Sequence, residues 1–356
     1  MSKTSPEKIA EYKAMCTEHV LDVKHDKTRA FLHRAFEEGY SMMAENFLTH
    51  HGFFQAPHTK TLTDVDIAIL GVPMDQGAPH RGGTRHGPES ARKWSHIHGP
   101  VNHQRIIPFE TCNVIDWGDM EFNSYSAKER CDEIYEAFKA FKAHNIVPLT
   151  CGGEHTMSHP IMKALSGNQS LGLIHLDAHA DTGATPIGGD DCNDVSIFRK
   201  AVLDGTLDPK RTVQIGIRGR ASIMWDFSRD TGMRIFSADE VHDRGVEAVM
   251  DEALQIVGAG PAYLSVDTDA IDSTYMPGTT LPEPFGLTGL QTRNIIRRLK
   301  DVDLVGADIA ELCPAHDANG ISANLVAGLM FEMLCLLSQA RTRRTGKTRK
   351  THWKKP

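Results

Sequence analysis

The 356-residue sequence lacks the features of secreted, membrane and nucleic-acid-binding proteins. Its first residues, Met1 to Pro6, contain no apolar segment of a signal peptide, and no apolar run reaches the roughly 18 residues that a membrane span needs. Seven cysteines, an odd number without a CxxC pair, are typical of a reducing compartment. A net charge of −7 argues against binding to nucleic acid. We therefore expect a cytoplasmic protein that binds neither membrane nor nucleic acid.

The chain predicts one catalytic domain with an appendage at each end. With 40% hydrophobic and 24% charged residues, it has the composition of a globular protein with a sizeable core. Residues 1–62 are polar and then amphipathic, which indicates an N-terminal helical extension. Residues 63–341 form the catalytic domain, and residues 342–356 form a basic C-terminal tail. The extension and the tail suit contacts in an oligomer.

Short β-rich apolar runs alternate with helical stretches throughout the central part of the chain. This alternation predicts an α/β fold of three layers, α/β/α, with a central parallel sheet. The functional loops of such a sheet begin at the carboxyl ends of its strands. The expected strands are 65–71, 146–149, 171–176, 213–217, 262–266 and 302–309, and the expected helices are 30–48, 129–144, 238–257, 288–299 and 323–337.

Three clusters of polar residues follow expected strands: Gly152 to Thr156, His175 to Asp181, and Ser265 to Asp272. In the second, Asp177, His179 and Asp181 recur at every second residue, so an extended chain points all three to one side. Converging carboxylates repel one another without cations, and a mixture of carboxylates and imidazoles suits first-row divalent metals. We therefore predict two divalent ions that activate water for hydrolysis.

The same clusters resemble the three signatures of the arginase/agmatinase, or ureohydrolase, family. Supporting segments are Gly71 to Gly77, Arg85 to Pro88, Gln214 to Arg218, Pro277 to Thr279 with Pro282-Glu283, and Ala310 to Pro314. The resemblance covers residues 65 to 340 and is strongest to the agmatinase branch. It implies an arginase-like fold and hydrolysis of a guanidino carbon–nitrogen bond with release of urea.

The resemblance also implies roles for individual residues. His155, Asp177, Asp181 and either Asp269 or Asp267 would hold one ion, and His179 with Asp177, Asp181 and Asp267 would hold or bridge to the other. Glu311 stands where the family places the carboxylate that binds the guanidinium, a cation whose N–H donors need a fixed acceptor. Asp181 would pass a proton to the leaving amine, so Asp181 and Glu311 are the expected catalytic residues.

Two departures from the family pattern bear on the substrate. Glu154 replaces an aspartate before His155, which alters the support of that imidazole. The segment from Gly188 to Val195 lacks the histidine of arginases and agmatinases, so Asn193 or Asp194 takes its place. We therefore expect guanidine, a biguanide or a guanidino acid as substrate in preference to agmatine. A guanidino acid suits the acidic loop least, unless an arginine such as Arg218 binds its carboxylate.

Other predictions follow from single residues and from the family. His86 and Trp225 are candidate substrate contacts, the latter as a wall for a cation. The two ions would be Mn²⁺, with Ni²⁺ as the alternative, because imidazole and carboxylate ligands suit both. The expected assembly is a homo-oligomer, trimer or hexamer. The alternatives left open are agmatinase proper, another amidohydrolase of this fold, and a metal-binding subunit that supports a catalytic paralogue.

Overall fold

The computed structural model describes residues 4–16, 23–41, 52–77, 81–184, 192–219 and 224–353. The chain forms two compact units, Met1–Ser41 with Trp353–Pro356, and Met42–His352. This division falls near residue 41, and the expected domain boundaries at residues 62 and 341 stay predictions. Within the larger unit, Arg349 and Thr351 donate backbone hydrogen bonds to the carbonyls of Thr111 and Phe109.

The smaller unit contains two helices, α1 (Pro6–Met15) and α2 (Asp26–Glu38). Helix α2 buries Phe31, Leu32 and Ala35, and the Phe31 ring packs edge-on against Trp353 at 5.6 Å between centroids. The helix ends at Gly39, which adopts the left-handed conformation that favours glycine. The helix expected over 30–48 therefore ends earlier, and residues 42–51 lie outside the described part of the chain.

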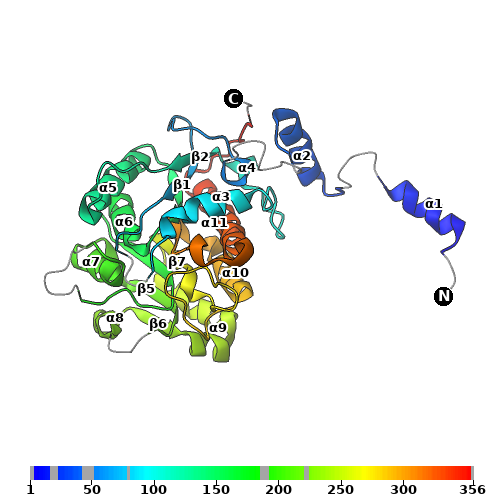
Figure 1. Ribbon diagram of the computed structural model, residues 1–356. Helices are drawn as coiled ribbons and strands as arrows, with labels where there is room; N and C mark the ends of the chain where they lie inside the picture. The colour runs from blue at the N-terminus through cyan, green and yellow to red at the C-terminus, as the bar shows by residue number, and fades with distance from the viewer. Residues whose placement is uncertain are drawn as a thin grey trace. The chain divides into compact units, whose positions relative to one another are not determined.

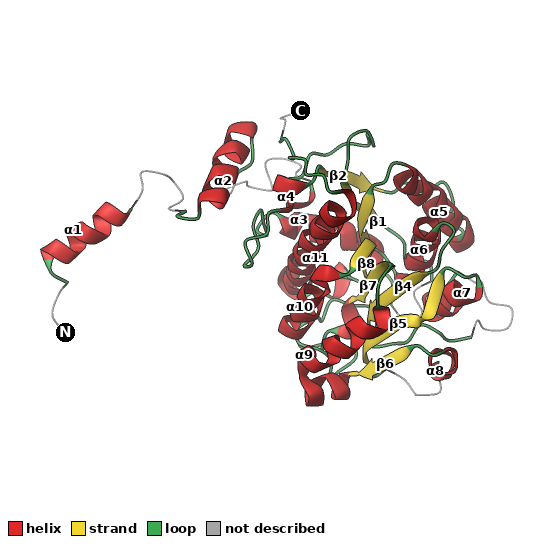
Figure 2. Cartoon of the chain, turned by 180° about the vertical axis from the view of Figure 1, so that it is seen from behind, coloured by secondary structure: helices red, strands yellow, loops and turns green. Residues whose placement is uncertain are grey.

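The larger unit is built on one sheet of eight parallel strands in the order β2-β1-β3-β8-β7-β4-β5-β6. Figure 2 shows the strands between two layers of helices. The last strand of the chain, β8, lies between β3 and β7 in the middle of the sheet. The strands are β1 Ile67–Val72, β2 Val114–Asp119, β3 Val147–Gly152, β4 Leu171–Leu176, β5 Leu207–Ile217, β6 Arg234–Ser237, β7 Pro261–Asp267 and β8 Asp303–Ala310.

Helices cover both faces of this sheet, which confirms the three-layer α/β/α prediction (Figure 1). Central strands such as β1, β3 and β4 are buried along their whole length, as parallel strands between two helical layers must be. One layer consists of α5 (Ala127–Ala143), α6 (Ser158–Ser166) and α7 (Ile197–Leu203), and the other of α3 (Gly87–Ser95), α9 (Ala238–Val257), α10 (Gly289–Arg298) and α11 (Ile321–Thr345). Short helices α4 (Pro108–Thr111) and α8 (Asp226–Thr231) complete the unit.

The sequence patterns missed both edge strands, β2 and β6. Strand β2 carries Asp116 and Asp119, which depress its apolar character, yet both carboxylates are used by Arg92 of α3. The guanidinium lies 2.8 Å from Asp116 Oδ2 and 2.6 Å from Asp119 Oδ1. An edge strand that is stabilised by tertiary ion pairs does not show the continuous apolar run of a central strand.

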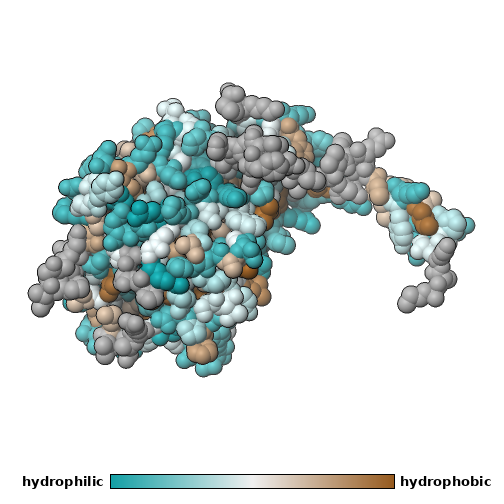
Figure 3. Space-filling view, in the orientation of Figure 1, coloured by the Kyte–Doolittle hydropathy of each residue, from teal (hydrophilic) through white to brown (hydrophobic). Residues whose placement is uncertain are grey.

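Helix α11, together with the short helical turn before it (Ala318–Thr345), is long and apolar enough to cross a membrane by length and composition, so the expectation that no apolar run reaches this length is wrong. Of its most apolar window, 72% is buried inside the protein. The helix packs against β8 and α3, as a core helix does. Polar residues dominate the visible face of the larger unit in Figure 3.

Candidate metal centre

The residues of the candidate site come from the ends of four neighbouring strands. His155 follows β3, Glu311 follows β8, Asp267 ends β7 and Asp177 follows β4. These strands are adjacent in the order β3-β8-β7-β4, so their carboxyl ends meet at one edge of the sheet. Residues separated by up to 156 positions in the chain thereby share one site.

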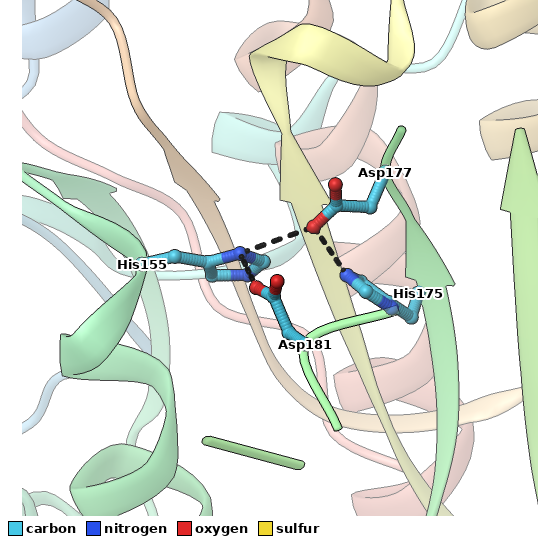
Figure 4. A group of neighbouring side chains, drawn as sticks. All are labelled: His155, His175, Asp177 and Asp181. Atoms are coloured by element: carbon cyan, nitrogen blue, oxygen red, sulfur yellow. Dashed lines mark hydrogen bonds and ion pairs between the residues drawn. The ribbon is translucent and has the colours of Figure 1, made fainter. Parts of the chain in front are cut away.

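The first half of the site surrounds His155. Its Nδ1 lies 3.3 Å from Asp177 Oδ2, 3.1 Å from Asp181 Oδ2 and 3.4 Å from Asp267 Oδ2. This nitrogen is buried and makes no hydrogen bond. Figure 4 shows one nitrogen of the His155 ring facing the carboxylates of both Asp177 and Asp181. A buried, unpaired imidazole nitrogen that faces three carboxylate oxygens has the arrangement of a metal ligand.

The second half surrounds His179, whose Nδ1 lies 2.9 Å from Asp269 Oδ2 and 3.4 Å from Asp177 Oδ1. Asp177 therefore presents one oxygen to each imidazole, which is the geometry of a bridging carboxylate. The structure separates the two aspartates that the prediction left open, because Asp267 faces His155 and Asp269 faces His179. Contrary to expectation, His179 has no contact with Asp181 or Asp267 among the ion pairs of the described residues.

Backbone amides fix the aspartates in these positions. The His179 N–H donates to Asp177 Oδ1, the Asp269 N–H to Asp267 Oδ1 at 2.8 Å, and the Ala178 N–H to Asp269 Oδ1 at 3.0 Å. Gly219 is required beside them, since a Cβ there would lie 2.4 Å from Cδ2 of the His179 ring. The loops thus hold the carboxylates in place before any ion binds.

The donor set fits two divalent cations. Burial, together with the charge of Asp269, holds the pKa of Asp267 well above its ordinary value, and burial with Asp177 raises the pKa of Asp269 to about 6. Asp267 and Asp269, together with Asp181, whose pKa is raised by burial and by the charge of Asp177, thus resist ionisation unless positive charge compensates them. Two divalent ions would balance the four charges of these three carboxylates and Asp177, and carboxylate with imidazole is a first-row transition-metal set.

His175 lies within this cluster, but its contacts make it a support and not a ligand. Gln214 Nε2 must be an amide nitrogen, since it donates to the Ala180 carbonyl at 2.6 Å. The same nitrogen donates to His175 Nδ1 at 3.0 Å, which leaves the proton of His175 on Nε2. That Nε2–H donates to Asp177 Oδ2 at 2.7 Å and so orients the bridging carboxylate.

Asp181 and Glu311, the two predicted catalytic residues, both adopt a left-handed backbone, with φ of 52° and 69°. Non-glycine residues in this region are strained and cluster at functional sites. Glu311 Oε1 accepts the His155 backbone N–H at 2.7 Å, and its Oε2 accepts the Thr280 hydroxyl. Burial raises the pKa of Glu311 to about 7 even though both hydrogen bonds oppose the shift.

A cavity of about 190 Å³ opens between the metal cluster and Glu311. The structure places Asp194 and Trp225 at this cavity, as predicted. It does not bring Asn193 or His86 there: Asn193 Oδ1 accepts the Ser196 hydroxyl at 3.1 Å, and His86 is exposed at the end of a short helical turn. The lining is His179, Ala180, Asp181, Gly183, Asp194, Val195, Gly219, Met224, Trp225, Asp267, Asp269, Thr280, Leu281 and Glu311.

Carboxyl groups outside the ligand set also lie at this end of the sheet, among them Asp194, Glu154 and Glu311. Burial and the neighbouring Glu311 raise the pKa of Asp194 to about 9, and the same two causes raise that of Glu154 to about 8. Asp194 Oδ1 is buried without a hydrogen bond at the cavity that the missing histidine would border. Of these groups, Asp194 and Glu311 line the cavity, and a cation bound there would favour their ionised forms.

Arg218 does not provide the expected partner for a substrate carboxylate. Its NH2 group donates to the carbonyls of Asp269 and Glu283 at 2.8 and 2.7 Å, and its Nε donates to the Pro284 carbonyl at 2.8 Å. The guanidinium therefore braces the loop that carries Asp269. The acidic segment Gly188–Asp191 lies outside the described residues.

Sequence reasoning missed several residues that shape the cavity. Val195, Met224 and Leu281 form apolar walls, and Thr280 holds Glu311. Their positions depend on loops whose course no periodicity predicts. Ser265, whose hydroxyl lies 2.8 Å from His155 Nε2, could have been found from the sequence. It stands two residues before Asp267 and therefore lies on the same side of β7.

The fold and the paired clusters define an α/β protein with a site for two divalent cations. Residues 65–335 match the model of the arginase family, and the chain belongs to this family. It is 39% identical to a guanidinopropionase of Pseudomonas aeruginosa over 82% of this chain and 92% of the relative. It is also 39% identical to the mitochondrial agmatinase of Gallus gallus, over 78% of this chain and 83% of that protein.

Solved structures agree with this membership. A hypothetical agmatinase from Burkholderia thailandensis superposes with a TM-score of 0.78 at 34% identity, covering 86% of this chain and 94% of the other. Proclavaminate amidino hydrolase from Streptomyces clavuligerus gives a TM-score of 0.80 at 30% identity, covering 83% and 100%. The predicted ureohydrolase resemblance and fold are thus confirmed, and the protein is a hydrolase of this family.

Proposed function

We propose that this protein hydrolyses a carbon–nitrogen bond of a small guanidino compound and releases urea. The observation that carries the proposal is the juxtaposition, across one small cavity, of the His155 and His179 clusters with the buried carboxyl of Glu311. Two divalent ions bound by His155, Asp177, His179, Asp181, Asp267 and Asp269 would supply activated water. The arginase family uses such a binuclear centre.

The chain's own residues would bind and orient the guanidinium. Glu311, held by the Thr280 hydroxyl and the His155 N–H, keeps oxygen lone pairs for the N–H donors of the substrate. Asp194 offers a second carboxyl at the same cavity. Asp181, close to the reacting centre, would carry a proton to the leaving amine.

The cavity favours a cationic substrate without a carboxylate. Among the described residues that line it, none is a lysine or an arginine, so an acidic tail would meet no partner. Met224, Trp225 and Leu281 instead offer apolar and aromatic contacts to a flat cation. We therefore place guanidine or a biguanide before guanidino acids, and agmatine last, because its ammonium end would face these apolar walls.

A guanidino acid is the second candidate substrate. The guanidinopropionase and the guanidinobutyrase of Pseudomonas aeruginosa are each 39% identical to this chain. Their names favour that substrate class, whereas the described lining of the cavity opposes it.

A urea-release screen tests both candidates. Guanidine, biguanide, guanidinopropionate, guanidinobutyrate and agmatine are compared at equal concentration, with Mn²⁺ and with Ni²⁺. Asp194→Asn should lower kcat/KM about tenfold or more, whereas Asn193→Ala, next to it but outside the cavity, should change it less than threefold. Agmatine turnover above that of guanidine and biguanide would overturn the substrate order, and urea release from none of them would overturn the function.

The remaining proposals concern ions, assembly and location. Mn²⁺ is the first choice for both positions and Ni²⁺ the alternative, because the ligand set suits either. We propose a homo-oligomer, trimeric or hexameric. Its subunit contacts would bury the exposed apolar side chains of α1, namely Ile9, Tyr12 and Met15. A cytoplasmic location and the absence of membrane and nucleic-acid partners stay predictions from the sequence.

A further inference from the structure

A chain of hydrogen bonds runs from the buried side of His155 into the centre of the sheet. His155 Nε2 lies 2.8 Å from Ser265 Oγ, which donates to Asp308 Oδ1 at 2.7 Å. Tyr263 donates its hydroxyl to the other oxygen of Asp308 at 2.8 Å. All four side chains are at most 1% exposed. We call His155, Ser265, Asp308 and Tyr263 the relay.

The strand register builds the relay. Ser265 of β7 is the direct partner of Asp308 in β8, and Tyr263 precedes Ser265 by two residues, so both hydroxyls lie on one face of β7. β8 lies between β7 and β3, and His155 directly follows β3. The strand order therefore brings the His155 imidazole close to Ser265 and Asp308.

The direction of the protons is fixed by what each group can donate. Asp308 accepts from two hydroxyls, so the single proton of Ser265 points to Asp308 and Ser265 Oγ must accept from His155 Nε2–H. With its proton on Nε2, His155 presents the lone pair of Nδ1 to the three carboxylates of the metal cluster. Every donor of the relay thus points toward Asp308.

No ion pair among the described residues explains the burial of Asp308. No lysine or arginine of the described residues forms an ion pair with it, although a carboxylate without exposure is costly to bury. Its two acceptors are used by the two hydroxyls of β7. Through Ser265, Asp308 orients the Nε2–H of His155 away from the metal cluster and so keeps Nδ1 directed to it as a ligand.

His179, the imidazole of the other half, has no equivalent support. Its Nε2 lies 3.4 Å from Glu283 Oε1, and these side chains are 20% and 23% exposed. Water competes for so long and open a contact, and its length is at the limit of a hydrogen bond. The two halves of the cluster therefore differ in their outer support, and Glu283 provides a matched control.

The geometry points to Asp308 as a positioning residue that, through Ser265, sets the affinity of the ion bound by His155. This inference rests on the proposed binuclear centre and concerns one of its two ions. Asp308 touches neither an ion nor the substrate. Its effect belongs to metal binding and not to the substrate cavity.

Titration of the metal-free full-length protein with Mn²⁺ alone tests the inference. The electron paramagnetic resonance signal of free Mn²⁺ gives the number of ions bound and each Kd without any turnover. We expect two ions per wild-type chain. Ser265→Ala and Asp308→Asn should each weaken one ion about 10- to 100-fold and leave the other within about threefold. Glu283→Gln should change neither Kd by more than about threefold.

The double variant Ser265→Ala with Asp308→Asn distinguishes a relay from two separate contributions. If Ser265 and Asp308 act through the same hydrogen-bond chain, their losses of Mn²⁺ affinity should not add. The double variant should then have the same Kd as the single variant that binds Mn²⁺ more weakly. If Asp308→Asn fails to fold, Ser265→Ala still tests the connection. Additive losses, or Kd values for both variants within twofold of wild type, would overturn the relay while two bound ions keep the proposed centre. A wild-type chain that binds no Mn²⁺ would overturn both.

Discussion

Replacing Glu311 by glutamine removes one negative charge from the cavity and leaves the size of the side chain unchanged. In the structure Glu311 Oε1 accepts the His155 backbone N–H at 2.7 Å, and Oε2 accepts the Thr280 hydroxyl. A glutamine can keep both contacts, because its oxygen accepts from His155 and its amide donates to the Thr280 oxygen after that hydroxyl turns. The substitution therefore isolates the charge that would hold a guanidinium.

The magnitude follows from the burial of Glu311, which is 3% exposed. Truncating one partner of a buried, hydrogen-bonded charge pair costs 2–5 kcal/mol, and about 3 kcal/mol corresponds to roughly 150-fold in kcat/KM. Urea release measures this loss, and metal analysis should find the same ion content as in wild type, because Glu311 is not a ligand. A glutamine variant with kcat/KM within threefold of wild type would refute guanidinium binding by Glu311.

Three further perturbations have defined outcomes. Gly219→Ala should displace the His179 ring, since its Cβ would lie 2.4 Å from Cδ2, and Mn²⁺ analysis should find about one ion per chain; two ions would show that the loop adapts. Burial alone would raise the pKa of Asp204, but the hydrogen bond from His159 holds this pKa below its ordinary value. The ionised Asp204 therefore stabilises the folded state fully above about pH 4, and this stabilisation is lost as the pH falls further. Asp204→Asn should thus lower the free energy of unfolding by about 1 kcal/mol at pH 7 and by less near pH 3, as measured by urea denaturation; a constant difference would contradict the ion pair. Removing metal with a chelator should lower the melting temperature, and Mn²⁺ at about 1,000 times its Kd should restore about 4 kcal/mol; an unchanged melting temperature would speak against ions that stabilise the fold.

The clustering of the predicted ligands could be inferred from the sequence because their spacing has a direct structural meaning. Alternation in Asp177, His179 and Asp181 after an apolar run places three donors beyond one strand end, and the structure has them there. The pairing of Asp267 with His155 and of Asp269 with His179 could not be predicted in the same way. It depends on which strands are neighbours, and no local sequence pattern gives the order β3-β8-β7-β4.

Single residues outside the motifs were predicted less well, for two physical reasons. His86 lies near a family segment, yet the turn at Gly83 to Gly87 leaves its side chain exposed. Asp308 lies inside the expected strand 302–309, where a buried carboxylate needs a hydrogen-bond partner. That partner, Ser265, became visible only from the register of β7 and β8.

The position of β8 in the sheet has a consequence for how the protein is made. Synthesis runs from the N-terminus, so β3 and then β7 leave the ribosome before Asp303–Ala310. Until then the nascent chain exposes two unpaired strand edges on either side of a gap, which are templates for aggregation. Insertion of the last strand closes both edges, delivers Glu311 and completes the relay at once. Truncated chains that end before residue 303 should therefore depend on chaperones and retain little metal, whereas the finished chain acquires its fold and its chemistry in one event.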